Sequence, residues 1–319
     1  MSTPQLVLPR PGTTNPQDKI SSISAPSESS FIATFGSLLP AASYLQTPHG
    51  RAAYYSLPPS SQSTTSISHV LLIHGVQTPS IGLYPLVRSL SALSPSTHYI
   101  LLDLWGHGLS DTPVAPHTPE LFHDLISALL DHLAWKTFHL IGYSFGGSTV
   151  VSFAGRYPER ALSMALIAPA GLIPSKGFSE VERGYLDPRK GNGDAEHERK
   201  AREWILDFLE GGELVVPADW EERVSRGEVV AEAVRDVVGV FRDGGVLDRH
   251  AVFEEVMRRG EVWGFSVLGE LDGVCGLGDL EAVGMRKEDV VVVKGVGHAV
   301  VRERAEEVAQ LIEGFWKKV

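Results

Sequence analysis

The sequence is poor in cysteine, in long apolar runs and in positive charge, and each shortage excludes a class of protein. Cys275 is the only cysteine in 319 residues, so the chain has no internal disulfide, in agreement with a reducing compartment. No apolar run approaches the ~18 residues of a membrane-spanning helix. Residues 1–30 lack the basic start and apolar stretch of a secretory signal. We therefore expect a cytoplasmic protein without a transmembrane segment.

Positive charge is scarce, since 28 Lys and Arg residues face 39 Asp and Glu residues, for a net charge of −11. This surplus repels phosphate backbones and anionic membranes, which argues against nucleic acid as a partner. It is also uneven, because residues 1–170 carry 7 basic and 8 acidic side chains and residues 171–319 carry 21 and 31. The character of the chain changes near residue 170.

Metal and nucleotide motifs are missing from the sequence. It has no H-E-x-x-H pattern and no Cys/His set at metal spacing, and Glu196-His197-Glu198 lies in a charged stretch typical of solvated surface. The glycines from Gly142 to Gly147 do not form the G-x-G-x-x-G of a dinucleotide site. We expect no metal and no cofactor.

From about residue 50, short aliphatic or β-branched runs alternate with longer amphipathic stretches. Several runs are apolar on both faces, which is typical of a parallel sheet covered by helices. The expected strands are residues 52–56, 69–73, 98–102, 138–141, 162–167, 263–268 and 290–294, and the expected helices are 84–93, 119–133, 145–157 and 302–316. The pattern predicts an α/β fold.

Two segments depart from this alternation. Residues 1–30 are rich in Ser, Pro and Thr, which is typical of a tail that cannot order itself unaided, although Leu6, Val7 and Leu8 can still pack on a neighbour. Residues 171–260 are charged and helix-favouring and lack strand patterns. We interpret them as a mainly helical insertion in one α/β domain, whose core comprises residues 31–170 and 261–319.

The segment Gly142-Tyr143-Ser144-Phe145-Gly146 connects a predicted strand to a predicted helix. It is a G-x-S-x-G motif, in which a sharp turn exposes the serine and small flanking residues let strand and helix approach closely. The following helix N-terminus supplies free N–H groups and positive potential. Ser144 is therefore the candidate nucleophile.

With this motif, the sequence resembles the α/β-hydrolase superfamily over most of residues 50–319 apart from the insertion. Leu71-Leu72-Ile73-His74-Gly75 resembles the family's third strand and oxyanion loop, and residues 103–111 resemble the loop after its fourth strand. The resemblance implies a mostly parallel central sheet flanked by helices. It also implies that residues 171–260 form a cap, inserted between strands 6 and 7, that lies over the nucleophile.

The resemblance extends to the residues that would activate the serine. A serine hydroxyl needs a base, and Gly295-Val296-Gly297-His298 matches the family's G-x-G-H motif after the last strand, which implies His298. A carboxylate should orient this imidazole. The family's G-x-x-D pattern falls on Asp272, with Glu270 and Asp279 as alternatives.

The family also implies an oxyanion hole formed by the backbone N–H groups of Val76 and Phe145. We expect His74, Trp105 and His107 to hold their loops rather than take part in catalysis. Cys275 is expected to be a small buried apolar residue.

These residues imply a serine hydrolase that cleaves a carboxylic ester or lactone of a largely apolar small molecule. Serine at position 144 excludes the aspartyl-ester chemistry of haloalkane dehalogenases and most epoxide hydrolases. Alternatives with the same triad are cyclisation or lactone formation, acyl transfer, and carbon–carbon bond hydrolysis. The last is disfavoured because residues 76–79 are not a glycine-rich loop. A small-molecule receptor on this fold is less favoured, since the triad looks complete.

The aromatic side chains of the insertion have two possible roles. They form either the cap's own core or the wall of an apolar acyl pocket from which water is excluded. These residues are Phe178, Tyr185, Trp204, Phe208, Trp220 and Phe241.

Overall fold

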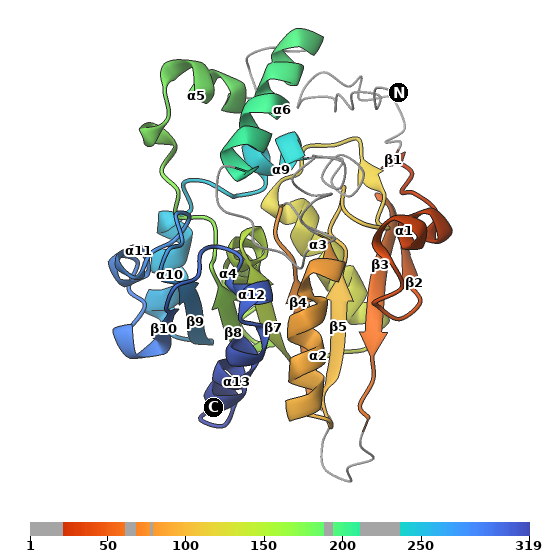
Figure 1. Cartoon of the computed structure of the whole chain (residues 1–319), viewed down its shortest axis with the longest axis vertical. Coiled ribbons are helices and arrows are strands. Elements are labelled where there is room, and N and C mark those ends of the chain that lie inside the picture. The colour runs from red at the N-terminus through yellow and green to blue at the C-terminus, as the bar shows by residue number, and fades with distance from the viewer. Residues whose placement is uncertain (1–21, 61–67, 77–78, 188–193, 211–236) are drawn as a thin grey trace.

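A central sheet organises the computed structural model, which describes residues 22–60, 68–76, 79–187, 194–210 and 237–319. Within these ranges the sheet has eight strands in the order β10-β9-β8-β7-β4-β5-β3-β2 (Figure 1). Strand β3 runs antiparallel to both of its neighbours, β2 and β5. The other six strands, β5, β4, β7, β8, β9 and β10, run parallel to one another. Their bounds are β2 Ser43–Thr47, β3 Gly50–Leu57, β4 His69–Ile73, β5 His98–Leu102, β7 Phe138–Tyr143, β8 Ala161–Ile167, β9 Trp263–Gly269 and β10 Val290–Val293.

Helices cover both faces of this sheet. On one face α2 packs against α12 and α13, and on the other α4 packs against α3 and α10 (Figure 1). The central strands are buried between these layers, as an apolar pattern on both strand faces requires. The helix bounds are α2 Tyr84–Leu93, α3 Pro119–His132, α4 Phe145–Arg156, α10 His250–Arg259, α12 Val300–Glu303 and α13 Ala305–Trp316.

The predicted α/β fold with a mostly parallel sheet is confirmed, and each predicted strand and helix is found within a few residues of its expected bounds. Two details differ. The edge strand β2 was not predicted, because its five residues, SYLQT, are half-polar and are nowhere fully buried. The predicted helix 302–316 is two helices that meet at Arg304.

The N-terminal segment packs on the core from residue 22 onward. The short strand β1 (Ser22–Ile23) pairs with β6 (Thr112–Pro113), and helix α1 (Glu28–Phe35) follows. Phe31 and Phe35 give α1 a buried apolar face. The predicted end of the tail at residue 30 therefore falls inside α1, and residues 1–21, with Leu6, Val7 and Leu8, lie outside the described residues.

The described part of the chain between β8 and β9 is mainly helical. It contains α5 (Glu180–Leu186), α6 (Ala195–Glu210), α9 (Val237–Asp243) and α10. Figure 1 shows α5, α6 and α9 together at one end of the sheet. The division of the chain into tail, core and cap stays a prediction.

The aromatic rings of this region contact one another. Trp204 on α6 lies 5.2 Å from Phe178 and 6.1 Å from Phe241, measured between ring centroids, and Phe208 and Tyr185 join the same cluster. The indole N–H of Trp204 donates to Glu182 at 2.9 Å. These mutual contacts are those expected of a small core belonging to the helices themselves. Trp220 lies outside the described residues.

Three histidines, His74, His123 and His139, are largely or fully buried in the domain. Burial lowers the pKa of each to about 4, because a charged imidazole is costly away from water. They are therefore neutral in the folded protein at neutral pH.

Two searches of the described residues gave negative results. None of the described helices has the length and apolar character to cross a membrane. The same residues contain no group of three or more His, Cys, Asp or Glu side chains that could hold a metal ion.

Candidate active site

The turn between β7 and α4 holds Ser144 in a strained conformation, with φ 53° and ψ −120°. Two glycines make this turn possible by letting backbones touch. A Cβ atom on Gly142 would lie 2.3 Å from the carbonyl oxygen of Gly146, and one on Gly146 would lie 2.2 Å from that of Ile73. Larger residues at either position would push strand and helix apart. The G-x-S-x-G pattern thus has a steric cause in this chain.

Ser144, His298 and Asp272 form one hydrogen-bonded line. The Nε2 atom of His298 lies 2.9 Å from Ser144 Oγ, and its Nδ1 lies 3.1 Å from each carboxylate oxygen of Asp272. The Asp272 side chain is fully buried, whereas that of His298 is 24% exposed. With the Nδ1 proton directed at the carboxylate, Nε2 is free to accept the serine proton.

The carboxyl ends of neighbouring parallel strands bring the acid and the base together. Asp272 follows β9 and His298 follows β10. A Cβ atom on Gly269 would lie 2.2 Å from the carbonyl oxygen of Gly297, so the two loops pack backbone to backbone. The Leu271 N–H also donates to the carbonyl of Val296 at 2.9 Å. These backbone contacts fix the distance between the loops that carry Asp272 and His298.

The other two candidate acids hold backbone elsewhere. Glu270 accepts the N–H of Gly295 at 2.9 Å, which braces the loop before His298. Asp279 accepts the N–H of Gly276 at 2.8 Å, at the start of α11 (Leu277–Ala282). Asp272 is thus the one of the three acids that contacts His298. Cys275 nearby is buried, and burial raises the pKa of its thiol.

The two expected oxyanion donors belong to segments that adjoin Ser144. Phe145 is the first residue of α4, and Val76 follows Gly75 in the loop after β4. A Cβ atom on Gly75 would lie only 2.9 Å from the Cβ of Ser144, so this loop passes directly against Ser144. Phe145 thus follows Ser144 directly, and Val76 follows the glycine that lies against Ser144.

The loop that carries Val76 is held by two buried histidine side chains. His74 Nδ1 donates to the carbonyl of Gly75 at 2.7 Å, and its Nε2 accepts the N–H of Leu104 at 2.9 Å. The Nε2 atom of His107 lies 2.8 Å from the carbonyl oxygen of Val76. These contacts agree with the loop-holding role expected of both histidines.

Asp103 supports the same region and was not singled out by the sequence. Its buried carboxylate accepts the N–H of Ser80 at 2.9 Å, the N–H of Leu109 at 3.0 Å and the hydroxyl of Tyr55 at 3.0 Å. Burial raises its pKa, and the three hydrogen bonds oppose that shift. Asp103 therefore ties the chain just after the oxyanion loop to β3 and to the loop after β5.

Two further residues next to the triad were also missed. The Tyr143 ring is buried, and its centroid lies 5.4 Å from that of the His298 imidazole. The guanidinium carbon of Arg302 lies 5.7 Å from the Tyr143 centroid. Burial raises the Tyr143 pKa, which the positive charge of Arg302 partly offsets. The motif marks position 143 only as variable, so it carried no signal for this contact.

Comparison with known proteins agrees with this geometry. A sequence model described as the alpha/beta hydrolase fold matches residues 68–233, half of the chain. The chain belongs to this family. Like other members, this α/β-hydrolase places G-x-S-x-G between a central strand and a helix.

Its curated relatives carry several different activities. It is 30% identical over 241 residues to the dihydrolipoyllysine-residue acetyltransferase component of the acetoin cleaving system of Pseudomonas putida, covering 71% of this chain and 58% of that protein. It is 29% identical over 128 residues to a 2-hydroxy-6-oxo-6-phenylhexa-2,4-dienoate hydrolase of Comamonas testosteroni, covering 37% and 45%. The chain thus spans about half the length of these relatives.

Solved structures share the fold across nearly the whole chain. A carboxylesterase from Bacillus subtilis superposes with a TM-score of 0.63 at 20% sequence identity, covering 90% of this chain and 96% of that one. At this identity the match concerns the fold alone.

Proposed function

We propose that this α/β-hydrolase is a serine hydrolase that cleaves a carboxylic ester or lactone of a largely apolar small molecule. The observation that carries the proposal is the continuous hydrogen-bonded line from Ser144 Oγ through His298 to the buried Asp272 carboxylate. This line supplies a nucleophile, a base in contact with it and a carboxylate that orients the base.

The first half of the reaction forms an acyl-enzyme. Ser144 Oγ attacks the substrate carbonyl carbon while His298 Nε2 takes the serine proton. The negative oxygen that develops is held by the backbone N–H groups of Val76 and Phe145. The tetrahedral intermediate collapses, the bond to the leaving oxygen breaks, and the proton on His298 passes to that oxygen. Asp272 stabilises the imidazolium throughout.

The second half repeats these roles with water as the nucleophile. His298 takes a proton from water, the hydroxide attacks the acyl carbon, and the same two N–H groups hold the oxyanion. Collapse breaks the ester bond to Ser144 Oγ, which recovers its proton from His298. The products are a carboxylic acid and an alcohol, or one hydroxy acid when the substrate is a lactone.

An apolar substrate is favoured by the way charge is distributed. The half of the chain that carries the nucleophile and the oxyanion loop is nearly neutral, and most of the negative surplus belongs to residues after 170. We propose that residues 171–260 act as a cap that excludes water and selects the acyl group.

Labelling by a fluorophosphonate probe tests the nucleophile. The wild type should react covalently, and Ser144→Ala should not react while keeping its circular dichroism spectrum and melting temperature. Ser148→Ala is the matched control, since Ser148 lies one turn along α4 and donates to the carbonyl of Gly245 at 2.7 Å. A wild type that fails to label, or a Ser144→Ala variant that labels as well as the wild type, contradicts the proposal.

Carbon–carbon bond hydrolysis is the second candidate, favoured by the likeness to the dienoate hydrolase of Comamonas testosteroni. The two chemistries separate when p-nitrophenyl esters of increasing acyl length are compared with a vinylogous diketone. Ester turnover with saturation kinetics supports the first. Labelling with turnover of the diketone alone would transfer the assignment to the second.

A further inference from the structure

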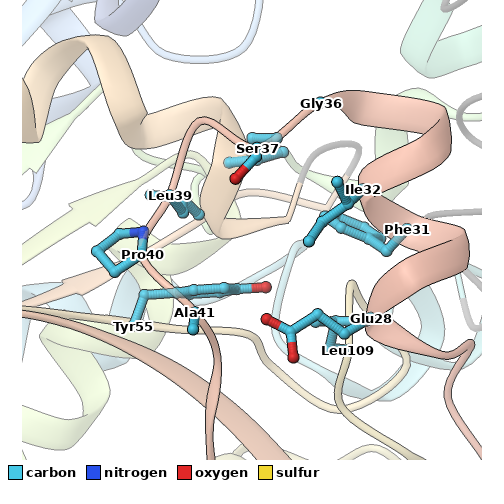
Figure 2. A pocket seen from close by; sticks show the side chains of 11 residues that line it. Glu28, Phe31, Ile32, Gly36, Ser37, Leu39, Pro40, Ala41, Tyr55 and Leu109 are labelled. Carbon is cyan, nitrogen blue, oxygen red and sulfur yellow. The ribbon is translucent and has the colours of Figure 1, made fainter.

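A separate pocket of about 120 Å³ lies between α1, the segment that follows it and β3. Figure 2 shows it from close by. Residues of α1 form one wall, and residues 36–41 form another. Tyr55 of β3 contributes its ring, and Ile81 and Leu109 come from the loops that Asp103 holds. None of the triad residues lines this pocket.

The walls combine aromatic and apolar surface with one carboxylate. Figure 2 shows the Tyr55 ring edge-on along one side of the space, with the Glu28 carboxylate beside its hydroxyl end. Phe31 and Ile32 lie on the α1 side, and Leu39 lies on the other. Tyr55 is held firmly, because its hydroxyl donates to the buried Asp103 at 3.0 Å.

The Glu28 carboxylate is anchored but not neutralised. Its Oε1 atom accepts the N–H of Ala42 at 2.8 Å, which holds the side chain at the pocket. The Tyr44 hydroxyl also hydrogen-bonds to Glu28, and Arg51 stacks on the ring of Tyr44 at 4.4 Å rather than pairing with Glu28. A negative charge therefore borders an aromatic and apolar space without forming an ion pair among the described residues.

We propose that this pocket binds a small organic ammonium ion. The charged nitrogen would lie over the face of the Tyr55 ring near its hydroxyl end, beside the Glu28 carboxylate, since a cation is attracted both by a carboxylate and by the face of an aromatic ring. The apolar body would contact Leu39 and Ile81. An engineered cavity of about 150 Å³ holds benzene, so a pocket of about 120 Å³ takes an alkyl group of a few carbons.

The first test compares n-butylammonium with 1-butanol, which has the same chain length and no charge. Binding is followed by ligand-observed NMR and by calorimetry on the whole protein. We expect a millimolar dissociation constant for the ammonium ion and binding weaker by about tenfold or more for the alcohol. Equal binding of the two, or no binding of the ammonium ion at tens of millimolar, overturns the proposal.

Variants locate the bound ion. Glu28→Gln keeps an acceptor for the Ala42 N–H and removes the charge, so it should weaken n-butylammonium about tenfold and leave 1-butanol unchanged. Glu281→Gln, an exposed acid on α11, is the charge-matched control and should bind as the wild type. Ala41→Met, which projects a longer side chain at the pocket wall, should weaken both ligands. Unchanged binding in both Glu28→Gln and Ala41→Met would refute this site.

The binding measurement is independent of catalysis. Ser144→Ala and fluorophosphonate-labelled protein should bind n-butylammonium as the unmodified protein does, because the pocket shares no lining residue with the triad. Loss of binding after labelling would place the ammonium ion at the serine instead and overturn the assignment. Failure of the esterase proposal alone would leave this result unaffected.

Discussion

Replacing Asp272 by asparagine keeps the shape of the side chain and removes its charge. The amide can present its NH2 group to His298 Nδ1, which then acts as an acceptor and leaves the ring proton on Nε2. A protonated Nε2 cannot take the proton of Ser144, 2.9 Å away. The variant also loses the charge that stabilises the imidazolium during attack.

The size of the effect follows from the distance between the two groups. His298 Nδ1 lies 3.1 Å from the carboxylate oxygens. At an effective dielectric constant of about 20, opposite charges at this separation attract by about 5 kcal/mol. Since each 1.36 kcal/mol is tenfold in rate, kcat should fall by about 10⁴. The same substitution in the Ser-His-Asp proteases has an effect of about 10⁴.

The assay is steady-state hydrolysis of p-nitrophenyl butyrate by the wild type, Asp272→Asn and Glu270→Gln. Glu270 is two residues away and braces the Gly295 N–H rather than His298, so Glu270→Gln should stay within about tenfold of the wild type. Melting temperatures establish that all three proteins are folded. A rate for Asp272→Asn within tenfold of the wild type, or an equal loss in Glu270→Gln, would refute the assignment of the acid.

Three further predictions concern packing and pH. Tyr143→Leu should lower kcat for p-nitrophenyl butyrate by about 10² with little change in KM, because it removes the ring that lies against His298. Tyr143→Phe keeps the ring and should stay near the wild-type rate. Equal losses in the two variants would show that the ring has no positioning role. Gly146→Ala should lower the free energy of unfolding in urea by about 1–3 kcal/mol, because its Cβ would lie 2.2 Å from a backbone oxygen. Gly314→Ala, in open space on α13, should raise it by about 0.5–1 kcal/mol. No loss in Gly146→Ala would contradict the steric account. The three buried histidines have pKa values lowered to about 4, so the unfolded chain binds more protons than the folded one between pH 6.5 and 4, and stability should fall as pH falls through this window. In urea unfolding, His123→Gln should reduce that slope by about 1.4 kcal/mol per pH unit, and an unchanged slope would mean that His123 does not contribute.

Most strands and helices could be predicted from the pattern of apolar residues along the sequence. Buried parallel strands are apolar on both faces, so each can be predicted from its own residues without knowledge of the strand it pairs with. The strand β2 escaped prediction because it lies at the sheet edge and is half-polar. The predicted boundary at residue 30 falls inside α1, because the Ser-rich composition of the N-terminal segment gives no sign that Phe31 and Phe35 pack on the core. The composition of a segment reflects only its own residues, whereas whether the segment is ordered also depends on its contacts with the rest of the protein.

The sequence by itself identified Ser144 as the candidate nucleophile and His298 as the candidate base. Ser144 lies in a short motif whose glycines let strand and helix approach closely, and His298 ends a G-x-G-H motif after the last strand. Only the tertiary structure showed which of the candidate carboxylates contacts His298. Asp272 and Glu270 are two residues apart on one loop, and only one of them reaches an imidazole that follows the neighbouring strand.

The contacts of Tyr143, Asp103 and Glu28 likewise join segments that are far apart in the chain or follow different strands. Such contacts depend on the order in which strands pair and on the packing of loops at their ends. Because no local pattern encodes that order, these residues became visible only in the folded chain.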